Sequence, residues 1–427
     1  MKWGRATITF VCAAIVALPL AGGTLPKSKP EDVGVSTERL QRVHEVIQHH
    51  IDAGDTSGAV TLIARRGHIA YFEAQGIMDL ETKKPMTKDT IFRLASMSKP
   101  ITAVAILILF EEGKIRLEDP VSKFIPEFKD MKVALQRGTG HPQGLIQPGL
   151  ETEFDLVPAD RDITIRDLLT HTSGFASSAY SARQVMKIAP RESSDTLASY
   201  IPKLASVPLD FQPGSQWRYS AVSGFEVLSR VVEVASGQAY DQFLKQRVFD
   251  PLGMKDTSFV QNKARLATLY VKGPRGLEPD VESPYLSSTY FSGAAGLMST
   301  AEDYLQLSEM LLNGGQSLNG KRLLSPKTVE LMSSNQVGDM FNGQRAQFGF
   351  SLLGMGFGLS TAVMTDDIAA RMRVSNGAFG WNGGYGTVFW VDPKEQMVEL
   401  LMIQGRNPEV FVIKSDFESA VMQSLVD

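Results

Sequence analysis

Two β-hairpin patterns at opposite ends of this 427-residue chain constrain its fold more than any other feature. Near the N-terminus, the apolar, β-branched runs 59–64 and 69–74 are joined by a short polar turn. Near the C-terminus, the similar runs 387–391 and 397–403 flank an Asp-Pro turn. Such runs around turn residues are typical of hairpins. Strands contributed by both ends of the chain predict one antiparallel sheet. The long middle of the chain is then an insertion between the two parts of this sheet.

Helices accompany both hairpins and fill the middle. An amphipathic helix is expected over 36–53, capped by Ser36 or Thr37 and ended by Gly54, and a closing helix over 410–425. Cap residues and apolar periodicity predict further helices, at 100–112, at 164–169, at 222–235, from Thr300 to Gly314 and from Ser325. We therefore predict an α/β fold, with an antiparallel β-sheet flanked by helices and an inserted, mostly helical lobe. The predicted domains are a discontinuous sheet domain, 24–90 with 335–427, and an inserted helical domain, 91–334.

The first 23 residues follow the pattern of a secretory signal peptide. Lys2 and Arg5 precede an apolar stretch over 8–20, and small residues follow it. An uncleaved anchor and a chance hydrophobic start are the alternatives. Cleavage near Gly23 would also remove Cys12, the single cysteine, so the mature chain would have neither disulfides nor a cysteine nucleophile. The sequence predicts a periplasmic or secreted protein without membrane contact after signal removal.

Composition and missing motifs exclude several functions. The formal net charge is -4 and basic runs are absent, which argues against nucleic acid as a partner. The sequence contains no G-x-S-x-G elbow, no phosphate-binding G-x-x-x-x-G-K-[ST] loop and no H-E-x-x-H zinc motif. The adjacent His49 and His50 point to different sides of a predicted helix. We therefore expect no metal and no other cofactor, and the oligomeric state stays open.

A serine and a lysine precede the most apolar predicted helix. In Ser96-Met97-Ser98-Lys99, the first and last residues are spaced i and i+3, so their side chains can meet on one helix face. Free amides at a helix N-terminus can stabilise an oxyanion, and burial with the positive end of the helix dipole disfavours a charged amine. Lys99 could then help to remove the Ser96 proton. The alternative is a capped helix start with an exposed lysine.

Two further segments could add chemistry. Tyr219 lies just before a predicted helix, where a phenol beside an amine can act as a general base; the alternative is a core tyrosine. The stretch Trp381-Asn382-Gly383-Gly384 precedes a predicted strand, and its glycines permit close approach of a ligand. An edge strand there could offer a backbone N–H to an anionic oxygen, and a plain glycine-rich turn is the alternative.

Taken in this order, the motifs resemble the serine β-lactamase and DD-peptidase superfamily, and above all the family VIII carboxylesterases, the branch similar to class C β-lactamases. The resemblance extends from about Val33 to the C-terminal helix. Four other stretches contribute to it: 92–99, 168–174, 248–254 and 293–297.

The resemblance implies a role for each motif. Ser96 would be the acylated nucleophile, Lys99 its proton partner and Tyr219 the general base. Trp381-Asn382-Gly383 would be the third motif, and the amides of Ser96 and Gly384 the oxyanion hole. His171 falls in a family motif, and we expect it to be structural.

The sequence departs from the superfamily pattern at two places. Ala221 stands where an asparagine often follows the tyrosine, and the third motif lacks a cation. Without that cation, carboxylate-bearing β-lactams should bind weakly and neutral esters should be better substrates.

We therefore expect a serine carboxylesterase acting on short-chain, small-molecule esters through an acyl-enzyme. One alternative is β-lactamase or D-amino-acid peptidase activity at the same site. Another is a non-catalytic protein resembling the penicillin-binding proteins. Residues 136–160 are predicted to form a long excursion, whose role stays open.

Overall fold

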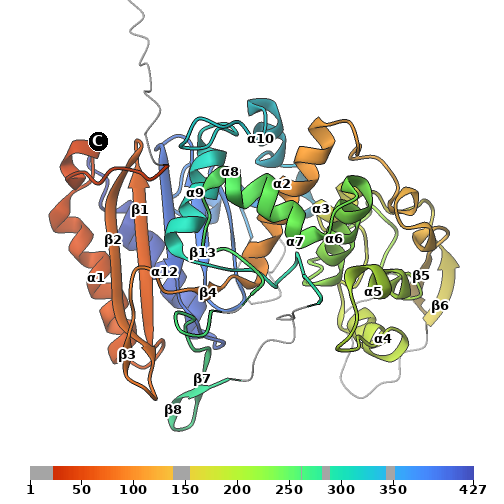
Figure 1. The fold of residues 1–427 in the computed structure, drawn as a ribbon, viewed down its shortest axis with the longest axis horizontal. Helices are drawn as coiled ribbons and strands as arrows, with labels where there is room; N and C mark the ends of the chain where they lie inside the picture. Colours follow the sequence, from red (N-terminus) through yellow and green to blue (C-terminus); the bar gives the residue numbers. More distant parts are fainter. Residues whose placement is uncertain (1–22, 138–153, 261, 281–288, 343–351) are drawn as a thin grey trace, which may run out of the picture.

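A computed structural model describes residues 23–137, 154–260, 262–280, 289–342 and 352–427. Its centre is an eight-stranded antiparallel sheet with the order β10-β11-β12-β13-β14-β1-β2-β3 (Figure 1). Strands from the two ends of the chain are neighbours in this sheet, because β14 pairs with β1, so the predicted α/β fold with a sheet built from both ends is confirmed. The sheet strands are β1 (Gly58–Arg65), β2 (His68–Asp79), β3 (Lys84–Pro85), β10 (Met355–Phe357), β11 (Ala362–Met364), β12 (Phe379–Asn382), β13 (Val388–Asp392) and β14 (Met397–Met402).

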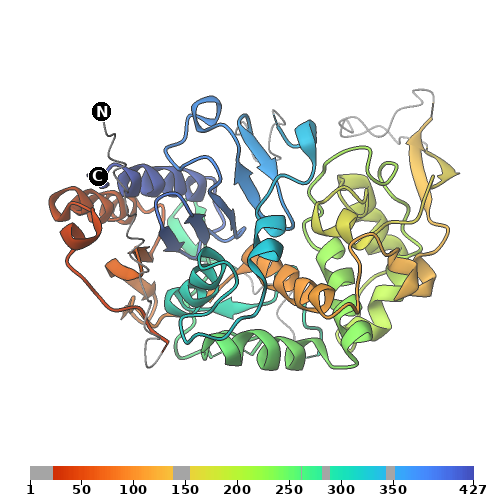
Figure 2. The ribbon, with the colours of Figure 1, turned by 90° about the horizontal axis from the view of Figure 1, so that it is seen from above.

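Helices cover both faces of the sheet, which explains why every residue of β1 is buried. Val60 and Leu62 point to one face and join the core beneath α9, whereas Ala59 and Ile63 point to the other face and join the core beneath α1 and α12. In the view from above, α1 and α12 lie beside one another on one side of the sheet and α9 lies on the other (Figure 2). The helices of these layers are α1 (Thr37–Asp52), α9 (Ala301–Leu312) and α12 (Glu409–Met422).

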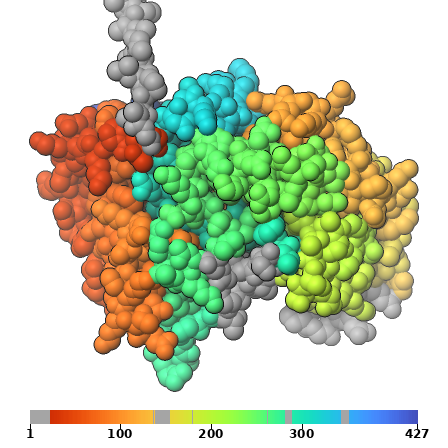
Figure 3. All heavy atoms as spheres, viewed as in Figure 1, coloured from red at the N-terminus to blue at the C-terminus, as the bar shows by residue number. Residues whose placement is uncertain are grey.

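The remaining helices form mainly the lobe beside the sheet (Figure 1). On the face shown in Figure 3, the green segment that carries α7 and α8 lies across the molecule between the N-terminal strands and this lobe. α9 belongs to the range 91–334 yet packs on the sheet, and the exact domain limits stay a prediction. These helices are α2 (Ser98–Glu111), α3 (Ile165–Leu169), α4 (Ala179–Ile188), α5 (Leu197–Leu204), α6 (Ser223–Ser236), α7 (Tyr240–Leu244), α8 (Asp250–Leu252), α10 (Pro326–Met332) and α11 (Asp367–Ala370).

Short elements complete the described chain. Three two-stranded ribbons accompany the main sheet: β4 (Phe92–Arg93) with β9 (Met298–Ser299), β5 (Lys132–Gln136) with β6 (Phe154–Pro158), and β7 (Tyr270–Gly273) with β8 (Gly276–Pro279). The short helical turns are η1 (Pro30–Val33), η2 (Ala95–Met97), η3 (Val121–Lys123), η4 (Pro126–Phe128), η5 (Lys245–Phe249) and η6 (Gly338–Met340).

The apolar helix α2 runs through the centre of the protein. All its residues from Ser98 to Leu109 are buried, as expected for a helix that is hydrophobic on every side. It packs against α6 of the helical lobe, and its N-terminus reaches the sheet through η2, which contacts β12. The predicted Ser-x-x-Lys motif therefore lies where the lobe meets the sheet.

Two expectations from the sequence need correction. The glycine-rich segment does not come from an edge strand: β12 lies between β11 and β13, and only its end is open, because Trp381 and Asn382 pair with β13 alone. Within the predicted excursion 136–160, residues 154–158 form β6, which pairs with β5, and 138–153 lie outside the described residues.

The predicted signal peptide also falls almost entirely outside the described residues. In the part of the chain that the structure covers, no helix combines the length and the hydrophobicity needed to cross a bilayer.

Candidate active site

Ser96 lies in the short turn η2, which continues directly into α2. It is half-buried, whereas every other residue from Ile91 to Pro100 is buried. Ala95 before it has a φ of 45°, a left-handed conformation that non-glycine residues rarely adopt and that is frequent at functional sites. The Ser96 amide precedes the first hydrogen-bonded turn and bonds to no described carbonyl. The serine thus presents both its hydroxyl and its amide.

Lys99 is completely buried, and three acceptors surround its amine. Nζ donates to Ser96 Oγ at 3.1 Å, to the carbonyl of Ala221 at 2.6 Å and to the carbonyl of Ala294 at 3.1 Å. An ammonium group has three N–H donors, so these acceptors satisfy it without water. Ala221, the departure from the family pattern, therefore contributes through its backbone. The predicted contact between Ser96 and Lys99 is present in the structure.

Tyr219 faces Lys99 with its ring and the third motif with its hydroxyl. The Lys99 amine lies 5.1 Å from the centre of the Tyr219 ring. The phenolic oxygen accepts a long hydrogen bond, 3.4 Å, from the indole Nε1 of Trp381, and the two rings pack at 5.4 Å. The hydroxyl has no hydrogen bond to Ser96 or Lys99 in this structure. Tyr219 and Trp381 are both half-buried, whereas Lys99 is completely buried.

His171 packs beneath Tyr219 as an uncharged ring. The ring centres are 4.6 Å apart, and Nδ1 of His171 accepts from the Ser220 amide at 3.2 Å, which places the ring proton on Nε2. Burial, and then the positive charge of Lys99, hold the pKa of His171 well below its ordinary value. Among the described residues, Nε2 has no hydrogen-bond partner. This aromatic packing agrees with the expected structural role.

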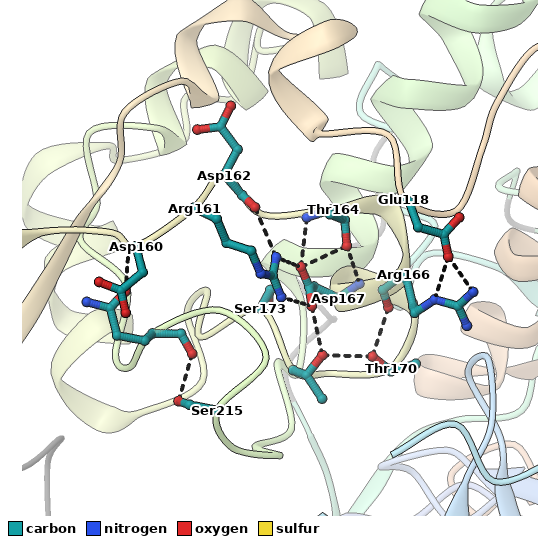
Figure 4. A network of polar contacts seen from close by, with 12 residues as sticks. Glu118, Asp160, Arg161, Asp162, Thr164, Arg166, Asp167, Thr170, Ser173 and Ser215 are labelled. Carbon is teal, nitrogen blue, oxygen red and sulfur yellow. Dashed lines mark hydrogen bonds and ion pairs between the residues drawn. The ribbon is translucent and has the colours of Figure 1, made fainter. Parts of the chain in front are cut away.

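A polar network fixes the loop that carries His171 (Figure 4). Thr164 caps α3 and shares a capping box with Asp167. Both carboxylate oxygens of Asp167 accept from Arg161, at 2.6 and 2.9 Å, and one also accepts from Thr172 Oγ1 at 3.2 Å. Thr172 follows His171 directly in the chain, so this network also fixes the position of the His171 ring that packs against Tyr219.

The glycine-rich turn after β12 lies against the backbone of Leu94, two residues before Ser96. A Cβ atom on Gly383 would collide with the Leu94 carbonyl and the Thr387 hydroxyl, so only glycine allows this approach. The Gly383 amide bonds to the Thr387 carbonyl at 2.8 Å, which closes the turn. Gly384 is exposed, and its amide bonds to no described residue. The turn that packs against Leu94 thus carries a backbone donor without a described partner.

A lysine that sequence reasoning missed lies behind this turn. The amine of Lys414, from α12, donates to the Gly383 carbonyl at 3.2 Å and lies 3.5 Å from Asn382 Oδ1. Burial of this amine lowers the pKa of Lys414 to about 7. The third motif therefore has a neighbouring cation after all, although it comes from a helix that begins 26 residues after Gly383.

The described residues contain no group of three or more His, Cys, Asp or Glu side chains placed to bind a metal ion. The groups gathered at the junction are a hydroxyl, two amines, a phenol, an indole and two free amides. Such a set suits acyl transfer, which needs a nucleophile, a proton acceptor and donors for an oxyanion.

Comparison with known proteins identifies the family. A match to the Beta-lactamase family covers residues 43–420, and the chain belongs to this family. "Protein Rv1367c" of Mycobacterium tuberculosis is 34% identical over 371 residues, which cover 84% of this chain and 88% of the relative. "Esterase EstB" of Burkholderia gladioli is 32% identical over 362 residues, 78% of this chain and 82% of the relative.

A solved structure supports the same relationship. The structure of "EstCE1, a hydrolase with promiscuous acyltransferase activity" matches with a TM-score of 0.73 and 29% identity, and covers 90% of this chain and 99% of that chain. The predicted superfamily is confirmed by these similarities.

Proposed function

We propose that this protein is a serine carboxylesterase that hydrolyses short-chain carboxylic esters through an acyl-enzyme on Ser96. One observation carries the proposal: the buried Lys99 amine donates to the half-buried Ser96 hydroxyl, and the amides of Ser96 and Gly384, the expected oxyanion donors, bond to no described residue. The similarity to the esterase EstB and to the hydrolase EstCE1 over most of their lengths supports it.

Acylation begins with attack of Ser96 Oγ on the ester carbonyl carbon. The serine proton passes to the base formed by Tyr219 and Lys99, and the carbonyl oxygen becomes an oxyanion held by the amides of Ser96 and Gly384. Collapse breaks the bond to the alkoxy oxygen, which takes the proton and leaves as the alcohol. Water then gives its proton to the same base, attacks the acyl-enzyme and releases the acid, and the proton returns to Ser96.

Lys99 and Tyr219 have different roles in the proton transfer of this scheme. With two carbonyls and the serine hydroxyl as acceptors, the Lys99 site suits an ammonium that stabilises the forming alkoxide. Tyr219 is then the mobile proton acceptor: it takes the serine proton in its phenolate form and becomes the phenol that later returns the proton. Its contact with Ser96 is expected to form in the substrate complex, since catalytic hydrogen bonds are often long in the free enzyme.

The preference for esters over amides follows from the leaving group. An alcohol needs less help from a general acid than an amine does, so one loosely held phenol suffices. Short acyl chains are expected because Tyr219 and Phe357 pack around Trp381, with ring centres at 5.4 and 5.3 Å, and leave these bulky rings beside the nucleophile.

Turnover of p-nitrophenyl esters of increasing acyl length, with labelling by a fluorophosphonate, tests this proposal. Ser96→Ala should lose labelling and at least about 10³-fold in kcat. Ser98→Ala is the matched control: this neighbouring hydroxyl accepts from the Leu297 amide at 3.2 Å, away from the Lys99 amine, so the variant should still label. A Ser96→Ala protein that retains both labelling and turnover would remove Ser96 from the mechanism.

Assays of the same proteins also distinguish the esterase from two alternative functions. If a chromogenic cephalosporin has a higher kcat/KM than p-nitrophenyl butyrate, the chain is a β-lactamase or peptidase rather than an esterase. If the parent neither labels nor hydrolyses any of these substrates, it is a non-catalytic binding protein.

Export is the second part of the proposal. The order of charged, apolar and small residues in 1–23 supports secretion or periplasmic location after cleavage. Mass spectrometry of the exported protein should find a chain that begins near residue 24. Recovery of the full-length chain from the cytoplasm alone would contradict this.

A further inference from the structure

Lys414 reaches the glycine-rich turn from behind. It lies in the second turn of α12, and its amine donates to the carbonyl of Gly383 at 3.2 Å. The same carbonyl accepts from the Gly386 amide at 3.1 Å, within the turn. The Lys414 side chain is partly exposed as a whole, and its amine also lies 5.2 Å from the centre of the Phe411 ring. This lysine touches neither Ser96 nor Lys99.

The carbonyl of Gly383 and the amide N–H of Gly384 belong to one peptide group. A cation on the carbonyl oxygen draws electron density from the peptide nitrogen, and hydrogen bonds linked in this way strengthen one another. We propose that Lys414 is a positioning residue of the esterase: it orients and polarises the Gly383–Gly384 peptide, so that the Gly384 amide binds the oxyanion more strongly. This inference rests on the proposed function.

The geometry favours this role over a contact with substrate. The Gly384 amide has no described partner, so its strength as a donor is available to a ligand. The amine of Lys414 is engaged by the backbone carbonyl on the opposite side of the same peptide. Removal of an entire oxyanion donor costs about 10²- to 10³-fold in kcat, and polarisation strengthens a hydrogen bond by about 10–30%, so the expected contribution is about two- to eightfold.

The polarising charge should depend on pH. Burial alone lowers the pKa of Lys414, to about 7, so the amine is charged below neutral pH and largely neutral in alkaline solution. The groups that face it are Asn382 and the Gly383 carbonyl from the turn, with the Phe411 ring from its own helix. No carboxylate of the described chain is among the causes of the shift in the pKa of Lys414, which is burial alone. The contribution of Lys414 should therefore decline as the pH rises through neutrality.

The test compares three variants in the full-length exported protein. Lys414→Met removes the charge and keeps the length of the side chain, and Lys414→Arg keeps a charge at every pH. Lys327→Met, at an exposed lysine of α10, is the control. For p-nitrophenyl butyrate, kcat and kcat/KM of Lys414→Met should fall together, by about two- to eightfold at about pH 6, and approach the parent at about pH 9. Lys414→Arg should match the parent at about pH 6 and exceed it by about two- to eightfold at about pH 9, where the amine of the parent is largely neutral. Because each ratio is taken at a single pH, titration of other catalytic groups cancels.

An infrared measurement distinguishes this role from a merely structural one and requires no variant. In a slowly hydrolysed acyl-enzyme with an isotope-labelled ester carbonyl, the stretching frequency falls when oxyanion donors strengthen. The parent band should therefore move to higher frequency from about pH 6 to about pH 9. As a control, Lys414→Met should show at both pH values the frequency that the parent reaches at about pH 9.

The outcomes separate two failures. If the parent hydrolyses esters through Ser96 but its band does not move and the Lys414→Met ratio is the same at both pH values, the Lys414 inference is wrong and the esterase stands. If the parent shows no Ser96-dependent ester hydrolysis, the proposed function fails, and the inference fails with it.

Discussion

Replacement of Gly383 by alanine should disturb the oxyanion donor without removing it. The new Cβ atom would collide with the Leu94 carbonyl and with Thr387 Oγ1. Neither neighbour can yield easily: the Leu94 amide is bonded to the Leu297 carbonyl at 2.9 Å, and the Gly383 amide is bonded to the Thr387 carbonyl at 2.8 Å. The turn itself must therefore move away from η2, and the Gly384 amide moves with it.

The size of the effect follows from these contacts. Overpacking of a close contact costs about 1–3 kcal/mol, so the free energy of unfolding should fall by this amount. Loss of one oxyanion donor costs about 10²- to 10³-fold, and partial displacement should cost about 10- to 100-fold in kcat with KM nearly unchanged. Turnover of p-nitrophenyl butyrate, at a temperature where urea denaturation shows the variant to be folded, measures both quantities.

Gly384→Ala is the matched control for stability. No heavy atom lies within 4 Å of the Cβ that it would add, so its free energy of unfolding should equal that of the parent. A Gly383→Ala protein with parental kcat and stability would refute the reasoning, because the close approach to Leu94 would then have no part in placing the amide.

Two further predictions concern the surroundings of the site, and a third concerns a buried carboxyl group of α9. Trp381→Phe removes the donor to Tyr219 but keeps an aromatic ring, so kcat/KM should fall about two- to tenfold. Asp167→Asn weakens the bond to Arg161 and should lower the free energy of unfolding in urea by about 1–3 kcal/mol. Burial raises the pKa of Glu309 from 4.5 to about 7, so ionisation of this carboxyl group destabilises the fold as the pH rises through this window. In urea denaturation, Glu309→Gln should therefore raise the free energy of unfolding by about 1–3 kcal/mol at about pH 8 and leave it unchanged at about pH 4.

Local signals predicted most of the regular structure. Thr164 does cap α3, Ser36 does cap α1, and Gly237 does end α6 in the left-handed conformation, because caps depend on residues only a few positions apart. The strands β1, β13 and β14 lie within two residues of their predicted limits, since turn residues bound them. The contact between Ser96 and Lys99 follows in the same way from helical spacing.

Features that depend on tertiary packing were missed. The short strands β10 and β11 carry too few residues for a periodic pattern, so the sequence did not reveal that β12 has a neighbour on its outer side. The position of Tyr219 relative to Trp381 depends on how the helical lobe meets the sheet. No pattern within either segment contains that information, and only the family resemblance brought the two together in advance.

The absence of a cation from the third motif shows how tertiary packing bears on the prediction of substrate specificity. A search of the third motif finds no lysine, and the sequence alone therefore predicts weak binding of carboxylate-bearing substrates. The packing of α12 against α1 and β14 brings Lys414 to the motif from outside it. Its amine is engaged by a backbone carbonyl and its burial favours the neutral form, so it is poorly suited to hold a substrate carboxylate. Below neutral pH a cation is thus near the motif, yet the preference for neutral esters still follows, because that charge acts on the peptide and not on the ligand.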